Sequence, residues 1–183
     1  MSFRNLILNA ALGVALGACL LTAAGVARAG GLAAADVAAP AQSSSALDRY
    51  ARNIQELSMH ALSYIGINYR HGGESPETGF DCSGLVRYVF RESIGLSLPR
   101  TARDMSRVGE SVRSGELQPG DLVFFNTLRR GFSHVGIYLG EHRFVHAPST
   151  GGQVRIEDMR GRYWVKRFSG ARRMPANTQI ALN

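Results

Sequence analysis

Cysteine is scarce in this sequence. Its 183 residues include only two, Cys19 and Cys82, and Cys19 lies in an apolar N-terminal stretch. If that stretch is removed during export, Cys82 is left without a disulfide partner, and an unpaired thiol in an exported protein needs an explanation. The close-spaced ligand pairs that are typical of structural zinc sites are also missing. A zinc site made of one cysteine and two histidines is nevertheless kept as an alternative to a reactive thiol at Cys82.

Lysine is almost absent as well, since Lys166 is the only one among 21 basic residues, and the formal net charge is +7. Such a charge indicates nucleic acid, acidic lipid or another anionic polymer as a partner, or else a compositional bias without a specific partner. The arginines form no block longer than a pair. Without a basic stripe, nucleic-acid binding is not expected.

The first 29 residues are predicted to be a secretory signal peptide. A basic start at Arg4 and a long apolar stretch precede the small-x-small site that ends at Ala29. The apolar run is long enough for a permanent membrane helix, but its alanines and glycines make it weakly hydrophobic, which favours cleavage. The "LGAC" that ends at Cys19 resembles a lipobox, so a lipoprotein anchored through Cys19 is the alternative to a soluble exported chain.

The rest of the chain is divided into a flexible linker (30–45), one domain (46–175) and a short tail (176–183). Helical spacing of apolar residues is found over 46–65, and a Gly-rich loop follows. A second helix is predicted from Asp81 or Cys82, and a short third one from Thr101, with Asp104 completing a capping box.

Five short β-type runs follow the helices: "LVFF", "HVGIYLG", "RFVHA", "QVRIE" and "YWVKRFSGARR". Helices first and strands after predict an α+β domain with an antiparallel sheet of about five strands.

Cys82 is predicted to lie in the first turn of its helix. The unpaired N–H groups and the positive end of the helix dipole favour a thiolate there. The N–H groups near Cys82 and Ser83 can also bind a developing oxyanion, while Gly84 leaves room for close approach. These features suit a nucleophile, and a buried structural cysteine is the alternative.

A thiolate nucleophile needs a histidine base, and the base needs an orienting group. The segment "SHVGIYLGEHRFVHAPS" predicts a β-hairpin that turns near Gly140 and Glu141, which would place His134 and His146 directly opposite each other on one surface. His60 and His142 are expected to have no catalytic role.

The sequence as a whole resembles the NlpC/p60 family of papain-like peptidases, which cut bacterial cell-wall peptides. The likeness is greatest to the small exported single-domain members from Gram-negative bacteria. The matching stretches cover most of residues 65–173 in order: "YRHGG", "GFDCSGLVRYVF", "LPRTA", "LQPGDLVFF", "HVGIYLG" and "FVHAPSTGG". The resemblance implies a papain-like α+β fold and a reaction that needs no metal or other cofactor.

The resemblance also implies roles for single residues. Cys82 would be the nucleophile, His134 the general base, and His146 the polar residue that orients His134. The expected oxyanion or substrate-lining residues are Tyr69, Asp81, Ser83 and Arg100, of which Asp81 and Ser83 would mainly shape the start of the helix.

The implied activity is hydrolysis of amide bonds in peptidoglycan stem peptides or cross-links, in the periplasm. Peptidoglycan is the expected partner, and the sequence does not identify a regulatory protein that would bind. The membrane is a partner only if Cys19 is lipidated. An amidase or acyltransferase with the same Cys/His/His site is one alternative. A catalytically inactive wall-binding scaffold is another.

Overall fold

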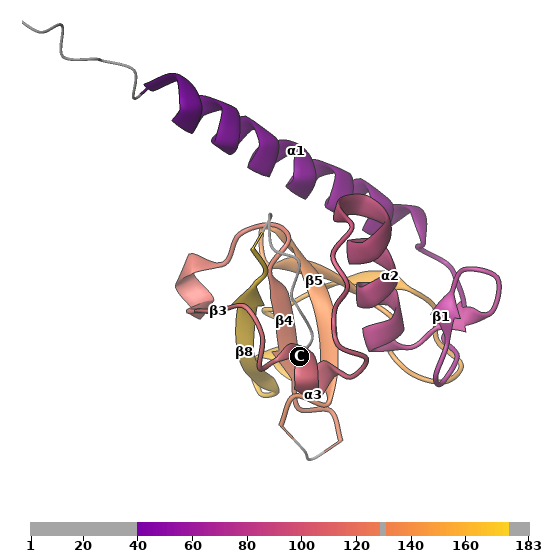
Figure 1. The fold of residues 1–183 in the computed structure, drawn as a ribbon. Coiled ribbons are helices and arrows are strands. Elements are labelled where there is room, and N and C mark those ends of the chain that lie inside the picture. The colour runs from indigo at the N-terminus through magenta and orange to yellow at the C-terminus, as the bar shows by residue number, and fades with distance from the viewer. Residues whose placement is uncertain (1–39, 129–130, 176–183) are drawn as a thin grey trace, which may run out of the picture. The chain divides into compact units, whose positions relative to one another are not determined.

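The computed structural model describes residues 40–128 and 131–175 (Figure 1). The predicted signal peptide with Cys19, residues 30–39 of the predicted linker, and the predicted tail lie outside the described residues. Among the described residues, none of the helices combines the length and apolar character that crossing a membrane requires.

The first described helix, α1, spans Pro40–Ser63 and so begins six residues before the predicted start, inside the segment assigned to the linker. Proline does not prevent this, because the first turn of a helix has N–H groups without helical acceptors and its φ suits proline. Leu57 and Ala61 are fully buried, and α1 packs beside α2 (Figure 1).

The second helix, α2, spans Cys82–Ile94, and its predicted start is confirmed. The Asp81 side chain accepts a hydrogen bond from the Gly84 N–H (2.6 Å), which is the N-cap arrangement. Gly95 ends the helix with φ of +69°, a conformation that glycine adopts without steric cost.

The predicted third helix is also present, as the short α3 (Ala102–Met105). Thr101 is its N-cap, and the Thr101 hydroxyl accepts from the Asp104 N–H (3.2 Å). Here, as at α2, a local pattern in the sequence correctly marked where a helix begins.

A six-stranded antiparallel sheet forms the other layer, in the order β3-β8-β4-β5-β6-β7. Its strands are β3 (Glu110–Val112), β4 (Leu122–Phe125), β5 (His134–Gly140), β6 (Arg143–His146), β7 (Arg155–Asp158) and β8 (Phe168–Arg173). A separate two-stranded sheet joins β1 (Glu74–Ser75) to β2 (Gly79–Phe80), and a 3-10 turn spans Ser114–Glu116.

Two details differ from the predicted strands. The sheet gains β3, which is short and largely exposed and therefore carries no apolar alternation that a sequence pattern could detect. The first half of "YWVKRFSGARR" is a helical turn, α4 (Arg162–Val165), and only its second half is a strand. Aromatic and β-branched residues suggested a strand, but Trp164 instead packs against Phe125 and Phe144.

The central strands of the sheet are buried on both faces. On one face, Val135 and Ile137 pack into the main core with α2. On the other face, Phe125, Phe144 and Trp164 belong to a smaller aromatic cluster, together with Val123, Tyr138 and Ala171. Because side chains alternate along a strand, His134 points to the aromatic side, opposite to its neighbour Val135.

The β5–β6 hairpin is present, but its register is two positions from the predicted one. Ile137 pairs with Val145. The turn lies at Glu141 and His142, which have φ of +50° and +61°, and a register shift between Tyr138 and Gly140 adds a bulge.

A shift of two positions keeps every side chain on its predicted face of the sheet, although it changes the partners. His134 and His146 are therefore diagonal neighbours on one face, and the direct opposition that we predicted is wrong.

Candidate active site

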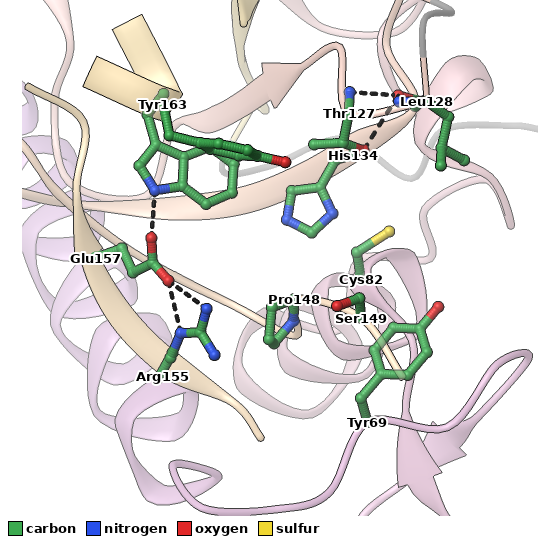
Figure 2. Close-up of a pocket in the computed structure, with 12 residues that line it drawn as sticks. Tyr69, Cys82, Thr127, Leu128, His134, Pro148, Ser149, Arg155, Glu157 and Tyr163 are labelled. Carbon is green, nitrogen blue, oxygen red and sulfur yellow. Dashed lines mark hydrogen bonds and ion pairs between the residues drawn. The ribbon is translucent and has the colours of Figure 1, made fainter. Parts of the chain in front are cut away.

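A cavity of about 390 Å³ opens where α2 begins and β5 starts. Cys82 and His134 both line it, with Tyr69 on the side of Cys82 (Figure 2). Trp164 also lines the cavity and contacts the ring of His134. Figure 2 also shows Pro148 and Ser149, which follow β6, on the wall near Tyr69. Elements that are distant in the sequence thus meet around one thiol.

Cys82 is a free, partly buried cysteine at the first position of α2. Burial raises the pKa of its thiol to about 11, and the negative charge of Asp81 acts in the same direction. Backbone N–H groups of Val135, Ser83 and Cys82 itself oppose this rise only in part. The helix start was predicted to favour a thiolate, but in the folded protein desolvation outweighs that effect.

His134 and His146 are in direct contact, with His134 Nε2 and His146 Nδ1 2.8 Å apart. Their ring planes are nearly perpendicular, at 89°, and both residues are almost fully buried. Burial lowers the pKa of each to about 3; the neighbouring His146 also lowers the pKa of His134, and Arg155 also lowers that of His146. Both imidazoles are therefore neutral at pH 7, and one ring donates the shared hydrogen bond to the other.

The resting site thus combines a neutral thiol with a neutral imidazole. Such a pair can act by general-base catalysis, in which His134 takes the proton while the sulfur attacks an electrophilic carbon. The N–H groups in the first turn of α2 have no helical acceptors and can face a developing oxyanion.

Of the four residues predicted to line the site near the oxyanion or the substrate, only Tyr69 lines the cavity. Burial raises the pKa of Tyr69, with the nearby Cys82 and Asp81 adding to the rise, so its hydroxyl stays protonated and can donate a hydrogen bond. The Tyr69 N–H donates to the carbonyl of Gly152 (2.8 Å), which fixes the backbone at this position.

Asp81, Ser83 and Arg100 form a polar network beside Cys82, and none of the three lines the cavity. Arg100 donates to both carboxylate oxygens of Asp81 (2.6 and 3.2 Å) and to the Ser83 hydroxyl (2.9 Å). Burial alone would raise the pKa of Asp81, but hydrogen bonds from Arg100 and Gly84 bring it below its ordinary value. The ionised Asp81 therefore fixes the start of α2 and the position of Cys82.

Nine of the lining residues were not predicted, among them Arg155, Glu157 and Trp164. The indole of Trp164 stacks on the His134 ring, with centroids 5.7 Å apart, and donates from Nε1 to the Glu157 carboxylate. The alternation in "QVRIE" could have placed Arg155 and Glu157 on one face of a strand. Their position beside the histidines could not be predicted, because it depends on the pairing of β6 with β7.

Among residues 40–128 and 131–175, no three His, Cys, Asp or Glu side chains are grouped closely enough to hold a metal ion. The thiol and the two imidazoles come from α2, β5 and β6 respectively, an arrangement that could serve as a nucleophile, a base and an orienting group.

Comparison with known proteins agrees with this geometry. The chain is 39% identical over 141 residues to the murein DD-endopeptidase MepH of Escherichia coli, an alignment covering 73% of this chain and 52% of MepH. It is 46% identical over 114 residues to the gamma-DL-glutamyl hydrolase of Bacillus subtilis, covering 62% of this chain and 27% of that protein. The chain thus spans about half or less of the length of these two relatives.

A solved structure of an NlpC/P60 family protein from Bacillus cereus superposes with a TM-score of 0.62 at 30% sequence identity, covering 66% of this chain and 39% of that one. The family model described as "NlpC/P60 family" matches residues 66–173, a range that holds Cys82 and both buried histidines. On this evidence, the chain belongs to the NlpC/P60 family.

Proposed function

We propose that this protein is a cysteine endopeptidase that hydrolyses amide bonds in peptidoglycan stem peptides or cross-links. The observation that carries the proposal is the arrangement of one free thiol, Cys82, at the start of a helix and in one cavity with His134, which is hydrogen-bonded to the buried His146. Of the two relatives described above, one is named a murein DD-endopeptidase and the other a gamma-DL-glutamyl hydrolase.

In the proposed reaction, His134 accepts the thiol proton as Cys82 attacks the carbonyl carbon. Because both groups are neutral at rest, proton transfer and attack are coupled, and the charge pair exists only along the reaction. The oxyanion lies against the first N–H groups of α2, and the Tyr69 hydroxyl is available as a further donor.

His134 then gives its proton to the departing amine, which leaves an acyl-enzyme on Cys82. Water attacks this thioester with His134 again acting as the base, and the free carboxylate product and the thiol are restored. Stem peptides carry carboxylates, which suits a chain of net charge +7.

The test is digestion of purified peptidoglycan with identification of the products by mass. The wild-type protein should release peptide fragments, and the masses identify the bond. Cys82→Ala should release none while keeping the circular dichroism spectrum of the wild-type protein. Full activity in Cys82→Ala would refute the nucleophile. An inactive wild-type protein would favour a wall-binding scaffold, whereas products carrying a new acyl acceptor would identify an acyltransferase.

We also propose that the protein is exported to the periplasm as a soluble chain that starts near Gly30. This rests on the small-x-small site that ends at Ala29. Mass analysis of the mature N-terminus tests it, and a diacylated Cys19 would show a lipoprotein instead.

A further inference from the structure

One buried nitrogen of the site lacks a hydrogen-bond partner among the described residues. It is Nε2 of His146, the ring atom that does not face His134, and the residue is fully buried. A buried polar atom without a partner costs free energy, so such an atom calls for an explanation. The Glu157 Oε1 oxygen lies 3.6 Å from it, slightly beyond hydrogen-bonding distance.

The Glu157 carboxylate is held in place from two sides (Figure 2). Arg155 Nε and Nη2 both lie 2.6 Å from Oε1, and Trp164 Nε1 donates to the other oxygen. The pairing of β6 with β7 fixes the strands, with Arg155 opposite His146. The carboxylate is therefore paired with a guanidinium, oriented and adjacent to the second histidine.

An ionised carboxylate accepts hydrogen bonds and cannot donate them. Beside His146 Nε2 it favours the tautomer that carries the proton on that nitrogen, which leaves His146 Nδ1 as an acceptor. Because Nδ1 lies 2.8 Å from His134 Nε2, the proton of that hydrogen bond then belongs to His134. His134 Nδ1 is left unprotonated and can accept the thiol proton.

The opposite tautomer is unproductive. If His146 carried its proton on Nδ1, it would donate to His134 Nε2, and the proton of neutral His134 would have to be on Nδ1. That nitrogen could not then act as a base. A wrong histidine tautomer is known to cost a Ser-His-Asp triad several orders of magnitude in turnover.

We propose that Glu157 is a positioning residue that selects the productive tautomers of His146 and His134 through the carboxylate oxygen that lies 3.6 Å from His146 Nε2, so that Glu157, both histidines and Cys82 act as one series. This inference rests on the proposed function for its kinetic consequences, but not for the tautomers themselves. It adds a fourth member, on β7, to a set taken from α2, β5 and β6.

The charges around the two rings are consistent with this role. Glu157 raises the pKa of His134, which favours the imidazolium formed when His134 takes the thiol proton. Arg155 acts in the opposite direction on His146. Since Arg155 is paired with Glu157, removal of the carboxylate would leave an unbalanced positive charge beside the His146 ring.

The direct test is nitrogen NMR of the histidine side chains, which reports the tautomer of each ring without a substrate. In the wild-type protein, His146 should be protonated on Nε2. Glu157→Met has a similar length but cannot accept a hydrogen bond, so it should shift His146 toward the Nδ1–H form or a mixture. An unchanged tautomer in Glu157→Met would overturn the proposal.

Asp158→Asn is the matched control, because it removes one negative charge from the same strand. Asp158 pairs with Arg160 and, as the next residue along β7, points to the other face of the sheet. This control should leave the tautomer and the turnover unchanged. A shift of the His146 tautomer equal to that in Glu157→Met would mean that any charge on β7 has this effect and would refute a specific role for Glu157.

Kinetics with peptidoglycan peptides provide the second measurement. Glu157→Met should lower kcat by roughly 10- to 100-fold, the range expected for losing one interaction with a charged group, with KM changed less than about twofold. A rise in KM with unchanged kcat would make Glu157 a substrate contact and overturn the positioning role. If the wild-type protein cleaves no peptidoglycan, the proposed function fails, while the tautomers still decide the role of Glu157.

Discussion

Lowering the pH from 7 to 5 should destabilise the fold through the two buried histidines. In the folded protein the pKa of each is about 3, whereas the ordinary value of 6.5 applies after unfolding. Below pH 6.5 the unfolded chain binds protons that the native site excludes. The stability from keeping both rings neutral is therefore fully present above pH 6.5 and is lost as the pH falls from there toward 3.

The magnitude follows from the size of that window. Each pH unit below the unfolded pKa costs about 1.4 kcal/mol per excluded proton, so the 1.5 units between pH 6.5 and pH 5 cost ~2 kcal/mol for one histidine. The two together give ~4 kcal/mol as an upper value, a large part of the stability of a domain of this size. The lowered pKa of Asp81 makes the free energy of unfolding depend on pH only near and below the ordinary carboxyl value of 3.8, which is outside the window from pH 7 to pH 5.

The measurement is urea unfolding at pH 7, 6 and 5, with extrapolation to zero urea at each pH. The free energy of unfolding should fall across the series in the wild-type protein. The fall should be about half as large in His146→Asn, where one titrating group is gone. His142→Asn, at the exposed hairpin turn, is the control and should retain the wild-type slope. A flat profile in the wild-type protein would refute the reasoning, as would an undiminished slope in a double His134→Asn/His146→Asn variant.

Three further outcomes are expected. Gly84→Ala should lower the free energy of unfolding by at least ~2 kcal/mol, because the new Cβ would lie 2.0 Å from the Gly73 carbonyl oxygen; an unchanged melting temperature would contradict this. Arg100→Met should lower the free energy of unfolding, measured in urea, by ~2–3 kcal/mol, because it leaves the buried Asp81 carboxylate without its guanidinium partner. A variant as stable as the wild-type protein would show that the pair is dispensable. Treatment with EDTA should leave hydrolysis of peptidoglycan unchanged, whereas a loss that zinc restores would support a metal site.

Local chemistry made the starts of the helices predictable. Asp81 and Thr101 each hydrogen-bond to a backbone N–H three residues ahead, and such contacts depend on a few consecutive residues only. The same signals placed Cys82 in the first turn of α2. The pairing of both histidines on one face could be predicted too, because alternation along a strand does not depend on the register.

The features that were not predictable depend on neighbours that are distant in the sequence. Glu141 and His142 are not typical residues for positive φ, so the sequence did not mark the true turn or the bulge that goes with it. The thiol pKa was misjudged because the burial of Cys82 by the rest of the fold cannot be read from its own helix. Glu157 and Trp164 could not be connected with His146 without the pairing of β6 with β7.

The raised pKa of Cys82 also bears on how long the protein survives in an oxidising environment. Peroxides and disulfides react with the thiolate, and a pKa of about 11 keeps that form scarce at pH 7. The cysteine therefore resists sulfenic acid formation and mixed disulfides while no substrate is bound. Each rise of one pH unit below that pKa increases the thiolate fraction about tenfold, so oxidative inactivation should accelerate as the pH rises.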